Sequence, residues 1–309
     1  MKIIFYSSGI NPEQWLNSLN RALPNSDIRV WQDGDVAAAD YAIVWKPPVS
    51  MLAGRSDLKA IFNLGAGVDA ILQLGDALPK GVPVIRLDDA GMGTQMAEYV
   101  SHALLRYYRR FDHYDQQRQA QHWQLLKPFE KQDFSVGVLG LGVLGERIVE
   151  AISGFGFPIN GWSRTQKNIA GVSCYAGQDG LDAFLKTSKV VVCILPLTDD
   201  TRNILNRNNL QKLPKGAYII NVARGAHLVE DDLLVLIREG HIAGATLDVF
   251  QTEPLPAGHA FWSEPRVSIT PHIAAMTLRD ESTKQIADKI NALANGQAVT
   301  GIVDPSRGY

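Results

Sequence analysis

The strongest constraint on what this chain can fold into is a glycine-rich segment near its middle. Residues 134–139 form an apolar run with two valines, which suits a buried parallel strand. Gly140, Gly142 and Gly145 follow at once, and the residues after them have the composition of a helix start. These glycines permit a tight turn, a phosphate close to the backbone, and a helix packed close to its strand. The segment predicts a dinucleotide-binding turn, with a plain structural turn as the alternative, because a lone motif of this kind is weak evidence.

Length and composition indicate an ordinary globular protein with about two domains. The chain has 309 residues, and its 46% hydrophobic content is ample for two cores. A net charge of −2 gives no basic surface for nucleic acid or an anionic membrane, so we expect small-molecule partners. The apolar runs in residues 1–6 and 190–195 are too short for a secretory signal or a membrane span, so we expect a soluble protein.

The two cysteines, Cys174 and Cys193, lie in apolar surroundings without any Cys/His ligand spacing. Zinc sites and disulfide frameworks require such spacing. We therefore expect no metal and a reducing, cytoplasmic location.

Short apolar runs alternate with helical or polar segments along the chain, which is the rhythm of βαβ units. The glycine segment lies inside a complete unit of this kind, with a first unit before it and a helix and tail after it. We predict an α/β fold with two doubly wound parallel-sheet domains, in which a Rossmann cofactor domain is inserted into a flavodoxin-like substrate domain. The expected boundaries are residues 1–93 with 274–309 for the substrate domain and 94–273 for the dinucleotide-binding domain.

A long helix is predicted from Thr94, which can cap it, to about Arg118. It is rich in tyrosine and leads into a polar arm, residues 119–131, that holds Trp123. Core packing is the plain interpretation of so many aromatic residues. A helix that is apolar around much of its circumference also suits a subunit interface, so we expect a homodimer formed through residues 94–131.

Three residues with catalytic chemistry follow predicted strands. Arg224, Glu253 and His272 each come just after an apolar run of the second domain. In a doubly wound sheet, ligands bind beyond the carboxyl ends of the strands, so we expect these side chains to face one crevice. Arginine can grip a carboxylate, histidine can donate a proton, and a glutamate can orient the imidazole, which is the set that 2-oxoacid reduction needs. Taken singly, each has a structural alternative: a surface charge, a solvated acid and a core histidine.

The chain resembles the D-2-hydroxyacid dehydrogenase family, and its bacterial glyoxylate/hydroxypyruvate reductase branch in particular. Four motifs that span most of the chain carry the resemblance: Gly140-x-Gly142-x-x-Gly145, Asn221-Val-Ala-Arg-Gly225, Leu247-Asp-Val-Phe-x-x-Glu-Pro254 and Pro271-His272. The resemblance implies substrate binding and orientation by Arg224, proton donation by His272, and Glu253 as the partner of His272.

The resemblance also covers a loop of the first domain, residues 63–69. It implies that backbone amides near Ala66 and Gly67 bind the substrate carboxylate, and a Gly-x-Gly segment at a strand end does expose N–H donors. An ordinary turn is the alternative. Trp45 and Lys46 follow another strand and are expected to add an aromatic wall and a cation, although an exposed lysine is usually only solvated.

One departure from the family pattern concerns the cofactor. NAD-specific members carry an acid after the second strand of the cofactor domain, whereas Arg164 stands there in this chain. A cation at this position favours the 2′-phosphate of NADP, so we expect NADPH as cofactor. The expected cofactor-binding residues are Gly140, Gly142, Val143, Leu144, Gly145, Ser163, Arg164, Thr165, Lys167, Pro196, Val222, Ala223 and Asp248.

The expected function is NADPH-dependent reduction of small 2-oxoacids, with glyoxylate and hydroxypyruvate as leading substrates. Two alternatives stay open at this point. One is another activity of the same family, and the other is a non-catalytic regulator that senses a dinucleotide on the same fold. Turnover of a 2-oxoacid separates an enzyme from such a sensor.

Overall fold

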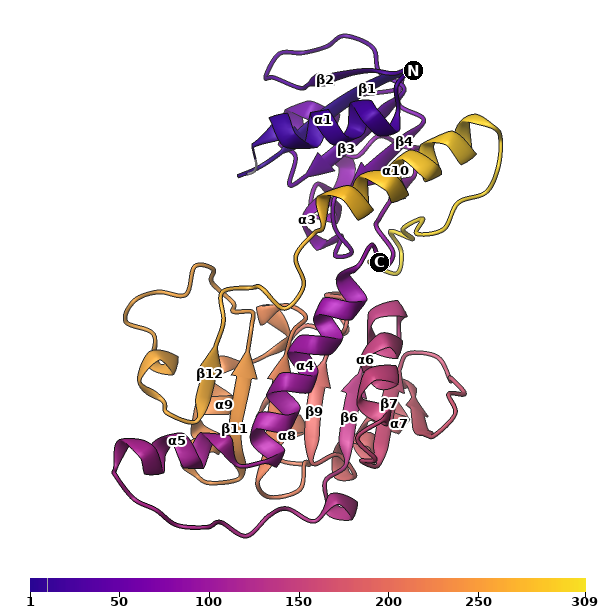
Figure 1. The fold of residues 1–309 in the computed structure, drawn as a ribbon. Helices are drawn as coiled ribbons and strands as arrows, with labels where there is room; N and C mark the ends of the chain where they lie inside the picture. Colours follow the sequence, from indigo (N-terminus) through magenta and orange to yellow (C-terminus); the bar gives the residue numbers. More distant parts are fainter. Residues whose placement is uncertain (10) are drawn as a thin grey trace. The chain divides into compact units, whose positions relative to one another are not determined.

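The structure, a computed structural model, describes residues 1–9 and 11–309. It contains two compact units (Figure 1). The first unit comprises Met1–Met92 and Thr277–Tyr309, and the second comprises Gly93–Met276. Each unit is built around its own parallel sheet with helices packed on it, so the predicted α/β fold with two doubly wound sheets is confirmed.

The sheet of the first unit has five parallel strands in the order β2-β1-β3-β4-β5. This is the flavodoxin-like order. Its strands are β1 (Lys2–Ser7), β2 (Asp27–Val30), β3 (Tyr41–Trp45), β4 (Ala60–Asn63) and β5 (Val84–Ile85). Its helical segments are α1 (Pro12–Ala22), α2 (Val49–Leu52), α3 (Asp69–Leu72), the 3₁₀ turn η1 (Gly75–Ala77) and α10 (Arg279–Ala294).

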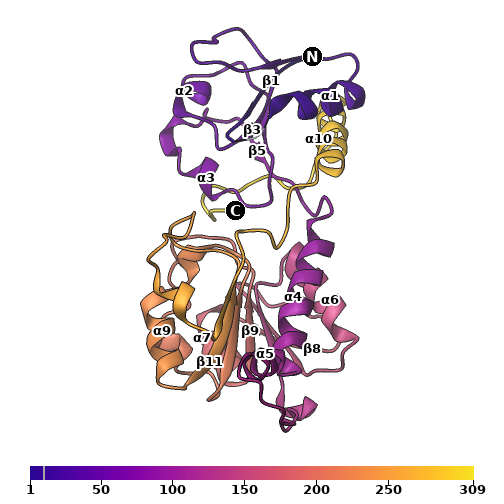
Figure 2. The same ribbon diagram turned by 60° about the vertical axis from the view of Figure 1, so that its left-hand side comes forward.

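Helix α10 returns the end of the chain to this first unit, where it lies beside α1 (Figures 1 and 2). The start of α1 is set by Asn11, whose side chain accepts a hydrogen bond from the Glu13 N–H at 3.0 Å. Trp15 and Leu19, four residues apart on one face of α1, are buried. The tail continues past α10 and pairs Ile302 with Ile85 in an antiparallel bridge.

The sheet of the second unit has seven parallel strands in the order β12-β11-β10-β9-β6-β7-β8. The chain runs outward from β6 to β8 and then returns to β9, so the strand order reverses between β6 and β9. This reversal is where open α/β sheets bind ligands. The strands are β6 (Val136–Leu139), β7 (Ile159–Ser163), β8 (Val172–Ala176), β9 (Val190–Cys193), β10 (Ala217–Asn221), β11 (Ile242–Leu247) and β12 (Val267–Ile269).

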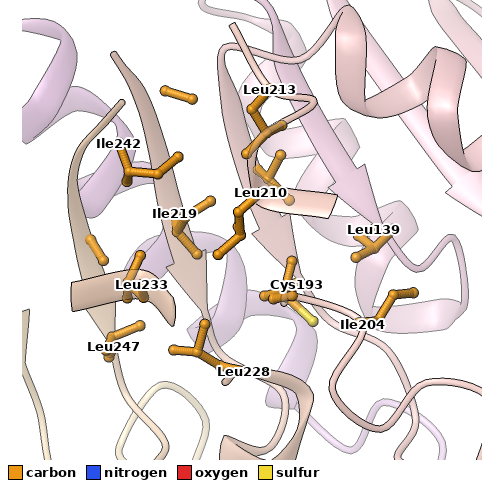
Figure 3. Packing of buried hydrophobic residues seen from close by; sticks show 14 of the residues in the cluster. Leu139, Cys193, Ile204, Leu210, Leu213, Ile219, Leu228, Leu233, Ile242 and Leu247 are labelled. Carbon is orange, nitrogen blue, oxygen red and sulfur yellow. The ribbon is translucent and has the colours of Figure 1, made fainter. Parts of the chain in front are cut away.

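Helices cover both faces of this sheet (Figure 2). Successive residues of a strand point to opposite faces, and β10 shows the consequence. Ile219 packs in the cluster under α7, α8 and α9, shown in Figure 3, whereas Tyr218 and Ile220 pack in the cluster under α4 and α6. The helical segments are α4 (Met92–Tyr108), α5 (Phe111–Gln119), η2 (Lys131–Asp133), α6 (Val143–Ser153), α7 (Gly177–Lys186), α8 (Arg207–Leu210), η3 (Gly225–His227), α9 (Glu230–Arg238) and η4 (Ala260–Ser263).

The predicted single helix from Thr94 to about Arg118 is wrong. Thr94 lies inside α4 rather than at its cap, and the helix breaks at Arg110, which has a left-handed φ of 61°. A contact distant in the sequence accompanies the break: the Arg110 guanidinium donates to the Lys127 carbonyl at 3.1 Å and lies 5.0 Å from the Phe129 ring centre. Strand β8, a half-exposed edge strand, was also not predicted. Among the described residues, no helix is long and apolar enough to cross a bilayer.

Candidate active site

The glycine turn after β6 has the geometry that its sequence predicts. Gly140 has a φ of 119°, a value that side-chain-bearing residues rarely adopt. A β-carbon added to Gly145 would lie 1.9 Å from the Gly140 carbonyl oxygen, so only glycine lets α6 start this close to β6. Gly142 differs, because a β-carbon there would meet nothing within 4 Å.

Gly142 is also the N-cap of α6 and offers no side-chain acceptor to the first turn. The first backbone N–H groups of a helix need an acceptor, and the helix dipole favours a negative one. Val143 and Leu144 begin this turn, next to the open space at Gly142. The turn therefore fits a dinucleotide pyrophosphate, which would be held by backbone amides of residues 142–145.

The loop after β7 carries the residues expected at the adenosine ribose. Arg164 and Thr165 are exposed, and the Ser163 hydroxyl donates to the Thr165 carbonyl at 2.8 Å. The Lys167 ammonium lies 3.1 Å from a carboxylate oxygen of Glu146 in α6. The loop thus presents two cations beside the glycine turn, and the 163–167 segment itself contains no acid. This charge pattern fits a phosphate better than a ribose hydroxyl.

The remaining expected cofactor residues lie near the carboxyl ends of β9, β10 and β11. Pro196 is exposed in the loop after β9, and its carbonyl accepts the Thr201 hydroxyl at 2.7 Å. Val222 and Ala223 follow β10 and are buried. Asp248 follows β11 and is 1% exposed, and its carboxylate forms hydrogen bonds with residues 270–274 of the same unit.

His272 and Glu253 form a hydrogen-bonded pair. The Nδ1 atom of His272 lies 2.8 Å from Oε2 of Glu253, and Oε1 of Glu253 accepts the Phe250 N–H at 3.0 Å. Because a carboxylate only accepts, Nδ1 carries the hydrogen, and Nε2 is left to exchange a proton with a substrate. The two side chains are 44% and 38% exposed, so both can be reached from solvent.

The turn that carries His272 is fixed by the buried carboxylate of Asp248. This carboxylate accepts the Thr270 hydroxyl at 2.6 Å and the N–H groups of Ile273 and Ala274 at 2.8 Å each. The Asp248 carbonyl accepts the His272 N–H at 2.8 Å, and His272 has a left-handed φ of 58°. A side chain is rarely held in that conformation without such support, so the turn is built to aim the imidazole.

Tyr99 of α4 extends this network. Its hydroxyl is hydrogen-bonded to the Thr270 hydroxyl, and since Thr270 donates to Asp248, Tyr99 must be the donor. Burial raises the pKa of Tyr99 to about 12, so the hydroxyl keeps its proton at neutral pH. Sequence reasoning treated Tyr99 only as part of an aromatic helix, and no local signal distinguishes it from Tyr107 or Tyr108, which pack in the core.

Arg224 follows β10 in extended backbone, and its neighbours fix its main chain. The Asn221 side-chain amide donates to the Arg224 carbonyl at 3.1 Å. Gly225 comes next, and a β-carbon there would lie 1.9 Å from the Phe250 carbonyl carbon. The main chain carrying Arg224 is therefore pressed against the segment that leads from Phe250 to Glu253, which brings arginine, glutamate and histidine to one edge of the sheet.

In the first unit, Asn63 shapes the loop that contains Ala66 and Gly67. Its side-chain amide donates to the Gly65 and Gly67 carbonyls at 3.0 Å and 2.9 Å, and the residue is 2% exposed. The C=O and N–H of a trans peptide point in opposite directions. Because these two carbonyls point towards Asn63, the following N–H groups of Ala66 and Val68 point away from it. Such a backbone suits an anion, and sequence reasoning did not include Asn63 among the site residues.

Trp45 and Lys46 lie beside this loop. A β-carbon added to Gly65 would be 2.6 Å from the Trp45 ring, so the ring lies directly against the loop backbone. Lys46 is exposed, has a φ of 47°, and places its ammonium 5.9 Å from the Trp45 ring centre. Within the described part of the chain, no group of His, Cys, Asp and Glu side chains could hold a metal ion.

A Rossmann unit with a basic loop after its second strand, joined to a histidine–glutamate pair and an arginine at neighbouring strand ends, defines a nicotinamide-dependent dehydrogenase. The family model described as D-isomer specific 2-hydroxyacid dehydrogenase, NAD binding domain, matches residues 101–274. The chain belongs to this D-2-hydroxyacid dehydrogenase family, as the four sequence motifs predict.

Relatives similar over their whole length agree with this assignment. The chain is 50% identical to a glyoxylate/hydroxypyruvate reductase A of Serratia proteamaculans and 49% identical to one of Yersinia enterocolitica, with all of each chain covered. Among solved structures, a family member from Xanthobacter autotrophicus in complex with NADPH and MES has a TM-score of 0.94 at 41% identity, covering 100% of this chain and 99% of that one. An NADPH-dependent glyoxylate/hydroxypyruvate reductase from Sinorhizobium meliloti, in complex with NADP and sulfate, has a TM-score of 0.93 at 35% identity, with the same coverage.

Proposed function

We propose that this protein is an NADPH-dependent reductase of small 2-oxoacids, converting glyoxylate to glycolate and hydroxypyruvate to D-glycerate. The observation that carries the proposal is the 2.8 Å contact between His272 and Glu253. The backbone of Arg224 and Gly225 lies directly against the segment that leads from Phe250 to Glu253, so the arginine lies near this pair. The full-length similarity to reductases of these two substrates supports the choice of substrates.

The side chains divide the reaction between them. The guanidinium of Arg224 binds the substrate carboxylate through its planar fork and polarises the neighbouring carbonyl oxygen. Bound NADPH supplies the hydride for the carbonyl carbon. His272 donates the proton from Nε2 to the carbonyl oxygen, and Glu253 stabilises the positive charge on the ring before that proton leaves.

We assign the contacts of the first unit to the substrate as well. The backbone N–H groups of the loop around Ala66 and Gly67 bind the carboxylate, because Asn63 holds the Gly65 and Gly67 carbonyls and so leaves the N–H groups of Ala66 and Val68 pointing away from it. Trp45 supplies an apolar surface and Lys46 a cation beside this loop. We therefore propose that the unit containing these residues is the substrate domain and that Gly93–Met276 is the cofactor domain.

A panel of 2-oxoacids tests the proposed substrates. Initial rates of NADPH consumption with glyoxylate, hydroxypyruvate and pyruvate give kcat/KM for side chains of increasing size. We expect turnover with glyoxylate and hydroxypyruvate. Tight NADPH binding without reduction of any of the three would instead fit a regulator that senses the dinucleotide.

The cofactor preference depends on Arg164. Together with Ser163, Thr165 and Lys167 it forms the positive loop after β7, and we assign these residues to the 2′-phosphate of NADPH. The solved relatives that carry NADP or NADPH support this assignment.

Replacing Arg164 by alanine is expected to remove most of the preference for NADPH over NADH. A charge-assisted hydrogen bond contributes roughly 1.5–3 kcal/mol, which corresponds to about ten- to a hundredfold in kcat/KM. Steady-state kinetics with both cofactors measure this ratio. Arg207→Ala, which removes an arginine paired with Glu239 at 2.9 Å in the same unit, is the matched control and should leave the ratio unchanged. An Arg164→Ala enzyme that keeps its NADPH preference would show that the phosphate is recognised elsewhere.

The arm in residues 119–131 supports a homodimer. Trp123 is 101% exposed and Leu125 is 88% exposed, although hydrogen bonds hold the backbone of the arm in place. The Tyr114 hydroxyl accepts the Leu126 N–H at 3.1 Å, and Arg110 donates to the Lys127 carbonyl at 3.1 Å. An arm that is fixed by polar contacts while its apolar side chains face solvent is suited to bind a second copy of the chain.

The dimer is expected to dissociate when these apolar side chains become charged. Trp123→Asp with Leu125→Asp should move the molar mass in light scattering from that of a dimer to that of a monomer, because the change buries charge at the interface. Val36→Asp is the control, since Val36 is 90% exposed on the first unit and outside the arm. A wild-type protein that is monomeric at micromolar concentration would contradict the proposed dimer.

We also propose a cytoplasmic location. Both cysteines are free thiols. Burial raises the pKa of Cys193 to about 12, so this thiol is not poised for exchange chemistry. Free cysteines without a disulfide framework suit a reducing compartment.

A further inference from the structure

His227 is a buried histidine that contacts two parts of the active-site edge. It is the last residue of η3 and is 0% exposed. Its Nε2 atom lies 3.2 Å from the Pro196 carbonyl oxygen, in the loop after β9. Its Nδ1 atom lies 3.3 Å from the nitrogen and 3.1 Å from the carbonyl oxygen of Arg224, three residues earlier. The ring thus connects the main chain of the substrate-binding arginine to a loop assigned to the cofactor.

The partners of the ring determine its tautomer. A carbonyl oxygen only accepts, so Nε2 carries the hydrogen and donates to Pro196. The Arg224 carbonyl also lies near Nδ1, but it already accepts the Asn221 amide and the His227 N–H. In the neutral ring the lone pair of Nδ1 therefore accepts the Arg224 N–H. Asn221 donates to the Arg224 carbonyl at 3.1 Å. The main chain of Arg224 is therefore held at its N–H by His227 and at its carbonyl by Asn221.

This arrangement matters because the planar guanidinium of Arg224 has to be positioned accurately against the substrate carboxylate. A guanidinium that grips a carboxylate and a neighbouring carbonyl tolerates little displacement, and an error of about 1 Å can cost a hundredfold in rate. Side-chain torsions of arginine can adjust, but only from a main chain that is fixed. A buried histidine with a purely structural role would affect the stability of the whole unit rather than the substrate step alone.

We propose that His227 is a positioning residue for Arg224, acting through the hydrogen bond from the Arg224 N–H to Nδ1. The inference relies on the proposed reduction of 2-oxoacids, in which Arg224 binds the carboxylate. His227 itself is 0% exposed, so we assign it no contact with the substrate.

Replacing His227 by asparagine or by glutamine tests its two hydrogen bonds, to Arg224 and to Pro196, one at a time. The side chain of asparagine places an acceptor near the position of Nδ1 and does not reach Pro196. The longer side chain of glutamine places a donor near the position of Nε2 and leaves the Nδ1 position empty. We expect His227→Asn to keep kcat/KM for glyoxylate within about threefold of wild type. We expect His227→Gln and His227→Ala to lower it by about a hundredfold, mainly by raising KM.

Two further measurements separate positioning from a structural role. The NADPH dissociation constant should change by less than about threefold in all three variants, since Thr201 continues to hold the Pro196 carbonyl. The Thr201 hydroxyl also accepts the Thr198 N–H at 2.8 Å, so Thr201 is the main anchor of this loop. Thr201→Val removes both bonds without touching Arg224, so it should weaken NADPH binding while KM for glyoxylate stays near that of wild type.

A double-mutant cycle with Arg224→Ala completes the test. If His227 acts through Arg224, then adding His227→Gln to Arg224→Ala should change kcat/KM by less than about threefold, because the group being positioned is already gone. Additive losses, or equal activities of the asparagine and glutamine variants, would overturn the inference. Wild-type turnover of glyoxylate is measured alongside, so failure of the proposed function is seen separately from failure of the role of His227.

Discussion

Replacing His272 by alanine is expected to lower kcat for glyoxylate reduction by roughly 10²–10⁴-fold, the range for loss of a positioned general acid. The imidazole is the proton donor of the proposed reaction, and both its pairing with Glu253 at 2.8 Å and its left-handed backbone turn serve to aim it. The NADPH dissociation constant should stay near that of wild type, because the glycine turn and the Arg164 loop are unchanged. Rapid-mixing single-turnover kinetics and a cofactor titration measure the two effects.

His259→Ala is the matched control for this variant. His259 also pairs with a glutamate in the same unit, with Nε2 of the ring 3.3 Å from Oε2 of Glu230, but it lies beside η4. Its loss removes a similar histidine–glutamate contact without removing the proton donor, so turnover should stay within a few-fold of wild type. Near-full turnover of His272→Ala would remove this histidine from the mechanism.

Replacing Gly225 by alanine is expected to cost at least about a hundredfold in kcat/KM. The added β-carbon would lie 1.9 Å from the carbonyl carbon of Phe250, 2.1 Å from its oxygen and 2.4 Å from the Gln251 nitrogen. All three are main-chain atoms, so no side-chain rotation relieves the clash. The Arg224 segment must then move away from the Phe250–Glu253 segment, which separates the arginine from the histidine–glutamate pair. We also expect a loss of about 1–3 kcal/mol in the free energy of unfolding from overpacking.

Gly154→Ala is the control for the glycine substitution. Gly154 caps the end of α6 with a φ of −63°, and a β-carbon there would meet nothing within 4 Å. Its Tm and kcat/KM should therefore match those of wild type within a few degrees and a few-fold. A Gly225→Ala enzyme with wild-type values of both quantities would contradict the close approach of the two segments.

Local sequence patterns predicted most of the fold. Apolar runs marked all the strands except β8, and the glycine turn marked the point where the strand order of the second sheet reverses. The break at Arg110 could not be predicted, since its left-handed conformation accompanies contacts with Lys127 and Phe129 far along the chain. Strand β8 was missed because edge strands of this length lack a strong apolar signal.

The candidate site likewise contains residues that the sequence predicted and residues that it did not. The rule that ligands bind beyond the carboxyl ends of parallel strands led to Arg224, Glu253 and His272. The residues that orient them were not recognised, because Tyr99 and His227 act through contacts that only the folded chain creates. Asp248 was predicted among the cofactor-binding residues. Its carboxylate accepts three hydrogen bonds from residues 270–274, an arrangement that no local pattern reveals.

The most direct test of the central claim follows the hydride itself. Hydroxypyruvate is reduced with NADPH deuterated at the transferred position of the nicotinamide ring, and the glycerate product is analysed by mass spectrometry and chiral chromatography. The proposed reaction predicts one deuterium on C2 of D-glycerate for each NADPH consumed, with much slower turnover when deuterated NADH replaces it. Tight binding of NADPH without label transfer, or label in L-glycerate, would contradict the assignment of this protein as an NADPH-dependent 2-oxoacid reductase.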